Sequence, residues 1–75
     1  MEFEELVGII ADKLNIEPET ITLNSRFTDD LGADSLDLFE IVNEIEDTLQ
    51  VQVPETDLSE IVTVEDALNA INDAV

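Results

Sequence analysis

The 75-residue sequence contains no cysteine, histidine, tyrosine or tryptophan. Without cysteine, the chain can form neither disulfides nor thiolate metal sites. Without histidine, it lacks the side chain that most often acts as a base near neutral pH. The sequence therefore supplies no base of suitable pKa to activate a serine as a nucleophile. We expect a protein that is not an enzyme and that holds no metal at a catalytic site.

Basic side chains are almost as scarce. Lys13 and Arg26 face 20 acidic residues, and the formal net charge is −18. Such a surface repels nucleic acid and anionic membranes, whereas basic protein surfaces and divalent cations suit it. Crowding of like charges also opposes compaction. We expect it to raise carboxylate pKa values on folding, so that stability increases as the pH falls from neutral.

No apolar run approaches the length needed to span a membrane, and the first five residues carry no basic side chain typical of a signal or transit peptide. The hydrophobic content of 44% is sufficient for folding. We therefore expect one small domain over residues 1–75, present as a cytoplasmic monomer with no stable membrane insertion.

Apolar residues recur at helical spacing in three segments. They predict helices over Phe3–Leu14, over Ser35–Leu49, and after Thr63, which forms a capping box with Asp66. The expected apolar stripes consist of Phe3, Leu6, Val7, Ile10 and Leu14; of Leu38, Ile41, Val42, Ile45 and Leu49; and of Val64, Ala67, Leu68, Ile71 and Val75.

The connections complete the expected fold. A short helix is predicted over Thr56–Ile61, and Val51–Pro54 is interpreted as an extended linker because no other segment could pair with it as a strand. Residues 16–33 form a long connection with a turn at Pro18. The fold class is therefore all-α: a small four-helix bundle, with three main helices plus one short helix and a long first loop.

The segment before the second helix, residues 31–37, reads LGADSLD. Asp34 is a favoured N-cap residue, and Asp37 completes a capping box with it. Gly32 allows the backbone to turn sharply into the helix. Ser35 then occupies the first helical position, where free N–H groups and the helix dipole favour a bound or attached phosphate.

Leu36 departs from the pattern of its helix. It projects into the acidic face beside Glu40, Asn43 and Asp47, and no residue of its own helix can bury it. Two interpretations remain open from this placement: Leu36 is an anchor for a docking partner, or the preceding loop covers it.

The LGADSLD segment resembles the attachment motif of the acyl carrier proteins of fatty acid synthesis. The likeness extends over the chain, from the acidic first helix and the long loop ending in DDLG to the short third helix and the capped fourth. The resemblance implies that Ser35 receives phosphopantetheine covalently from coenzyme A, through a transferase that uses Mg²⁺. The thiol of that arm would carry acyl groups as thioesters, which also explains the absence of cysteine.

The resemblance also assigns roles around Ser35. Asp34 and Leu36 flank the cofactor attachment site. The second helix would dock against basic patches on its partners, the phosphopantetheinyl transferase and the enzymes of fatty acid synthesis, and this favours the docking interpretation of Leu36. The implied partner-binding residues are Leu36, Asp37, Glu40, Asn43, Glu46, Asp47 and Glu60.

Three residues depart from the commonest pattern of the family. Leu38 replaces a small polar residue, Phe39 an aliphatic one, and Asn43 an apolar docking residue. They leave open which partner enzymes the chain serves, so a carrier for a dedicated polyketide, aminoacyl or other acyl pathway remains an alternative. A different class, an acidic protein that binds divalent cations without a covalent cofactor, would be distinguished by intact mass after exposure to a transferase.

Overall fold

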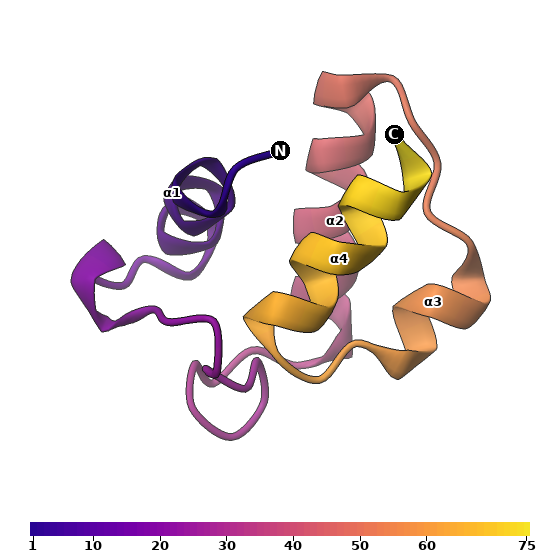
Figure 1. The fold of residues 1–75 in the computed structure, drawn as a ribbon. Coiled ribbons are helices and arrows are strands. Elements are labelled where there is room, and N and C mark those ends of the chain that lie inside the picture. The colour runs from indigo at the N-terminus through magenta and orange to yellow at the C-terminus, as the bar shows by residue number, and fades with distance from the viewer.

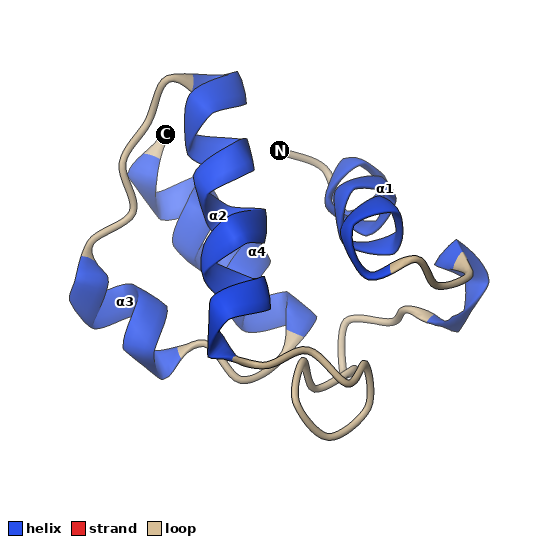
Figure 2. Ribbon diagram, turned by 180° about the vertical axis from the view of Figure 1, so that it is seen from behind, coloured by secondary structure: helices blue, strands red, loops and turns tan.

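A computed structural model describes residues 1–75 and places four helices around one apolar core (Figures 1 and 2). The elements are α1 Phe3–Leu14, a single 3₁₀ turn η1 Pro18–Thr20, α2 Ser35–Leu49, α3 Glu55–Glu60 and α4 Val64–Ala74. No strand is present, and none of the helices combines the length and apolar character needed to cross a bilayer. The predicted all-α fold, with three main helices and one short helix, is confirmed.

The ends of α1 and α2 follow from their flanking residues. Both helices are followed by a residue in the left-handed conformation, Asn15 and Gln50, each with φ of 57°. Their predicted bounds are confirmed. The short helix α3 lies one residue earlier than predicted at both ends. The carbonyl of Pro54 accepts the N–H groups of Asp57 and Leu58 and so starts the helix at Glu55, and the extended backbone of Ile61 ends it at Glu60.

The core joins the three long helices. Its 14 buried hydrophobic residues form one cluster: Leu6, Val7, Ile10 and Ala11 from α1; Ile41, Val42 and Ile45 from α2; Val64, Ala67 and Ile71 from α4; and Ile21, Phe27, Ala33 and Val53 from the connections. The short helix α3 buries no residue completely. The inward placement predicted for Val75 is wrong: its side chain is 74% exposed, because it lies beyond the end of α4.

The long first loop is fixed to the connection between α3 and α4 by backbone hydrogen bonds. The N–H groups of Phe27 and Val64 donate to the carbonyls of Val62 and Ser25, both at 3.0 Å. Ser25 is buried, and its hydroxyl accepts the Thr22 N–H at 2.9 Å. These bonds fix the backbone conformation of a loop that has little regular secondary structure.

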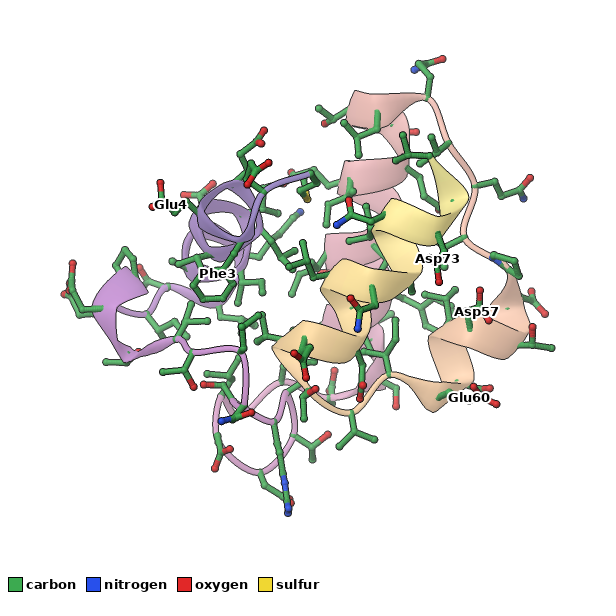
Figure 3. The ribbon with its side chains drawn as sticks, in the orientation of Figure 1. Phe3, Glu4, Asp57, Glu60 and Asp73 are labelled. Carbon is green, nitrogen blue, oxygen red and sulfur yellow. The ribbon has the colours of Figure 1, made fainter.

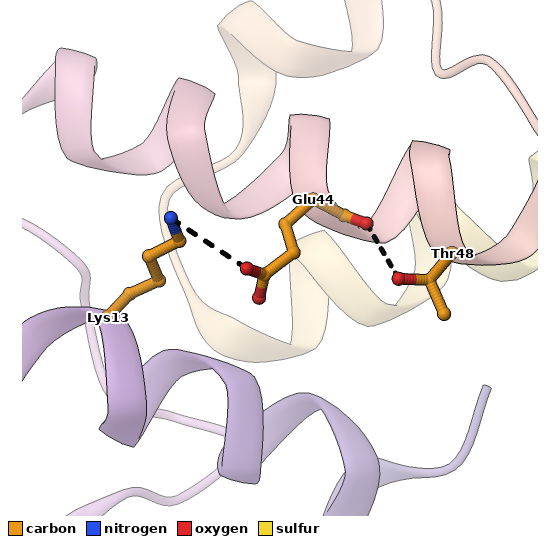
Figure 4. A network of polar contacts seen from close by, with 3 residues as sticks. All are labelled: Lys13, Glu44 and Thr48. Carbon is orange, nitrogen blue, oxygen red and sulfur yellow. Dashed lines mark hydrogen bonds and ion pairs between the residues drawn. The ribbon is translucent and has the colours of Figure 1, made fainter.

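The two basic side chains each contact one carboxylate. Lys13 Nζ lies 3.8 Å from Glu44 of α2, whose carbonyl also accepts the Thr48 hydroxyl (Figure 4), and Arg26 lies 3.5 Å from Asp29. These side chains are all more than a third exposed, so the pairs stabilise the fold only slightly. Cationic side chains therefore leave nearly all of the negative charge uncompensated.

Asp66 differs from the general expectation that crowding raises carboxylate pKa values. Its carboxylate accepts the backbone N–H groups of Thr63 and Val62, both at 3.1 Å. These hydrogen bonds, first that of Thr63 and then that of Val62, hold the pKa of Asp66 below its ordinary value. The capping hydrogen bonds thus outweigh the opposing effect of desolvation at this position.

We expect Asp66→Ala to lower the free energy of unfolding at neutral pH by about 1 kcal/mol, because it removes the acceptor of two backbone N–H groups. Because the folded-state pKa is depressed, ionised Asp66 stabilises the fold above the unfolded pKa of roughly 4, and this contribution disappears as the pH falls through the folded-state pKa. Urea unfolding from pH 7 to pH 3 should therefore show the difference between parent and variant shrinking with acid. Glu65→Ala, which removes a neighbouring charge from the same first turn, is the control. Equal effects of the two substitutions at all pH values would contradict this account.

Candidate functional site

Ser35 is the first residue of α2 and is exposed. Asp34 caps the helix: its carboxylate accepts the Asp37 N–H at 2.9 Å, and the Asp37 carboxylate accepts the Asp34 N–H at 3.3 Å. The predicted capping box is therefore confirmed. It fixes the first turn of α2 and leaves the serine hydroxyl at the positive end of the helix dipole.

The backbone before Ser35 is fixed at two points. Ala33 is buried, and its N–H donates to the Phe27 carbonyl at 2.7 Å. The side chain of Phe27 is itself buried, and its N–H is bonded to Val62. Gly32, directly before Ala33, has φ of +69°, a conformation that residues with a β-carbon rarely adopt. This rigid approach determines where the serine emerges.

A cavity of about 550 Å³ opens beside Ser35, between the N-terminal end of α2 and the short helix α3. The two helices lie next to each other at that end of the molecule in Figure 2. Half of the lining residues are apolar: Phe27, Leu38, Phe39, Leu58 and Ile61. Sequence reasoning missed this cavity, because it depends on how α3 and the first loop are placed against α2.

The predicted docking residues do not all have the same environment. Leu36 is 65% exposed, so the preceding loop does not cover it. Glu40, Asn43 and Asp47 of α2 and Glu60 of α3 are also exposed. Two others are half-buried and already bonded: Asp37 in the capping box, and Glu46, whose carboxylate accepts the Val53 N–H at 2.6 Å.

Other carboxylates gather between α3 and α4. Asp57 and Glu60 of α3 and Asp73 of α4 line a groove of about 200 Å³ on that side of the molecule, remote from Glu4 of α1 (Figure 3). No group of three or more acidic side chains is arranged so that it could hold a metal ion. The acids at this groove form part of the charged surface.

The site thus combines an exposed serine at a capped helix start with a partly apolar cavity beside it. Residues 4–71 match the family described as "Phosphopantetheine attachment site". The acyl carrier proteins of three Clostridium perfringens strains are each 42% identical to this chain over 71 residues, which cover 95% of this chain and 93% of theirs.

Solved structures agree with these relatives. A protein of Mycobacterium tuberculosis described as an acyl carrier protein superposes with a TM-score of 0.85 at 33% identity, over 96% of this chain and 97% of that one. The acyl carrier protein of Thermotoga maritima gives a TM-score of 0.80 at 26% identity, over 93% and 81% of the two chains. The chain therefore belongs to the acyl carrier proteins, a family defined by a covalently attached phosphopantetheine group.

Replacing each of the two glycines with alanine should change the free energy of unfolding in opposite directions. Gly32→Ala places a β-carbon at a positive φ just before the site and should lower the free energy of unfolding by about 1–2 kcal/mol. Gly8→Ala lies within α1, with open space around the new β-carbon, and should raise it by about 0.5–1 kcal/mol. Urea unfolding measures both, and a Gly32→Ala variant as stable as the parent would show that the approach to Ser35 is not constrained as described.

Proposed function

We propose that Ser35 carries the phosphopantetheine arm and that the protein transports acyl groups, as thioesters of that arm, between enzymes of fatty acid synthesis. The observation that carries this proposal is the exposed Ser35 hydroxyl at the capped start of α2, on a chain of the phosphopantetheine attachment family. The phosphodiester formed there would lie at the positive end of the helix dipole, where an anion is stabilised.

The other serines support this choice by contrast. Ser25 is buried, and its hydroxyl is bonded to the Thr22 backbone. Ser59 lies on α3 and donates its hydroxyl hydrogen to the Thr56 carbonyl at 2.9 Å. Only Ser35 combines exposure with the first position of a capped helix of more than two turns.

The environment of Ser35 fits an attached arm. The arm, when bound, supplies the thiol that the chain lacks, and it forms the thioester. The residues of this chain position and shelter it: the capping box holds the first turn rigid, and the cavity beside Ser35 offers an apolar lining between Leu38 and Leu58. Shielding an acyl chain there would remove apolar surface from water.

The surface around Ser35 supports docking to basic partners. Leu36 stands exposed among carboxylates next to the attachment site, with Glu40, Asn43 and Asp47 along α2 and Glu60 on α3. The partners are a phosphopantetheinyl transferase and the enzymes of fatty acid synthesis, each presenting a basic patch. A cytoplasmic location and a monomeric state remain predictions from the sequence, and so does the pathway.

Ser35→Ala should keep the fold and abolish loading, because it removes the only hydroxyl in the right context. The measurement is intact mass after incubation with a transferase, coenzyme A and Mg²⁺, together with the melting temperature. Ser59→Ala, which also changes a serine lining the cavity, is the matched control and should load like the parent. Gain of the prosthetic mass by the Ser35→Ala variant would rule out the assignment.

Glu40→Lys should slow association with a basic partner enzyme at low salt, since it reverses a charge on the docking helix. Glu4→Lys makes the same change in net charge on α1, and should leave the association rate closer to that of the parent (Figure 3). Stopped-flow kinetics at several salt concentrations compare the association rates of the two variants, and equal slowing would show that only net charge matters.

In the same assay, Leu36→Ala should mainly speed dissociation, because it removes an apolar anchor. A dissociation rate equal to that of the parent would show that Leu36 is no anchor.

A further inference from the structure

The short helix α3 forms one wall of the cavity beside Ser35, and its one hydrophobic side chain, Leu58, is only partly buried against the core. It has six residues, no completely buried side chain and no side-chain cap at its N-terminus. A helix of this length is not stable alone in water. Glu55, Leu58 and Ser59 nevertheless line the cavity, so the shape of the cavity depends on how the two ends of α3 are anchored.

The C-terminal anchor of α3 is a carboxylate that binds backbone N–H groups. Asp66 accepts hydrogen bonds from Val62 and Thr63 at 3.1 Å, and the Val62 carbonyl accepts the Phe27 N–H. The segment following α3 is thus fixed both to α4 and to the first loop.

The N-terminal anchor has the same chemistry and comes from α2. The Glu46 carboxylate accepts the Val53 N–H at 2.6 Å, across a separation of seven residues. The side chain of Val53 is 3% exposed and belongs to the core, while the next residue, Pro54, has no N–H to donate. The bond to Glu46 is therefore the polar contact that fixes the backbone just before α3 begins.

We propose that Glu46 is a positioning residue: through Val53 it holds the start of α3, and thereby sets the opening of the cavity beside Ser35. A charge-assisted hydrogen bond of this kind is stronger than a neutral one, and its loss would leave a half-buried N–H group without a partner. Without the carboxylate, the N–H would have to bond to water instead, and the connection before α3 would lose its polar link to α2. Glu46 thus has a role different from that of its exposed neighbour Asp47.

The effect on carried acyl groups rests on the proposed function, but the positioning role does not. It can be tested on the full-length, unmodified protein, whatever Ser35 carries. The experiment is amide hydrogen exchange followed by NMR for the parent, Glu46→Ala, Glu46→Gln and Asp47→Ala. Asp47→Ala is the matched control, because it removes the adjacent carboxylate, whereas the hydrogen bond that Asp47 accepts is to its backbone carbonyl.

We expect Glu46→Ala to accelerate exchange at Val53 and at the amides of α3 by about tenfold or more, with the amides of α1 and α4 unchanged. Glu46→Gln, which keeps an acceptor oxygen, should restore part of the protection. Asp47→Ala should exchange like the parent.

Two results would overturn the proposal. Parent-like exchange at Val53 and α3 in Glu46→Ala would show that the bond does not hold the connection. Equal acceleration in all helices would show that Glu46 contributes only to global stability.

Discussion

The site depends on the way Phe27 is held. Its N–H donates to Val62, in the connection before α4, and its carbonyl accepts the N–H of Ala33, just before the α2 cap. Its buried ring also joins the core that unites α1, α2 and α4. One residue thus links the first loop, the start of α2 and the segment after α3. The position of Ser35 and the shape of the cavity beside it both follow from that link.

Backbone N–H groups compensate part of the negative charge that the two cationic side chains leave unpaired. Because only Lys13 and Arg26 are available to pair with 20 acids, many carboxylates bond backbone N–H groups instead. Glu5, Asp30, Asp34, Asp37, Glu46 and Asp66 all do so. These bonds place negative charge where N–H dipoles compensate it locally. The acids that remain free give the exposed face of α2 its negative character.

The sequence was sufficient to predict the three long helices and the capped start of α2. Capping residues such as Asp34 and Thr63, helical spacing of apolar residues, and the stop at Asn15 determine where α1, α2 and α4 lie, because these effects act within a few residues. The exposed placement of Ser35 followed from the same reasoning.

The features that the sequence did not reveal are tertiary. The pairing of residues 23–27 with 62–65 uses backbone groups, which carry no signature in the side chains. The resemblance assigned Glu46 to the docking face, and nothing in the sequence indicated that its carboxylate accepts the Val53 N–H. The cavity between α2 and α3 arises only when these contacts are in place.

The central claim is that the capped start of α2 presents Ser35, and no other residue, for covalent attachment. Peptide mapping by tandem mass spectrometry, after the unaltered protein has been incubated with a phosphopantetheinyl transferase and coenzyme A, tests it most directly. The account predicts one arm per chain, on the peptide that contains Ser35, with the fragment ions placing it on that residue. An arm on a peptide that contains Ser25 or Ser59, or no arm at all with a transferase that loads other carriers, would contradict it.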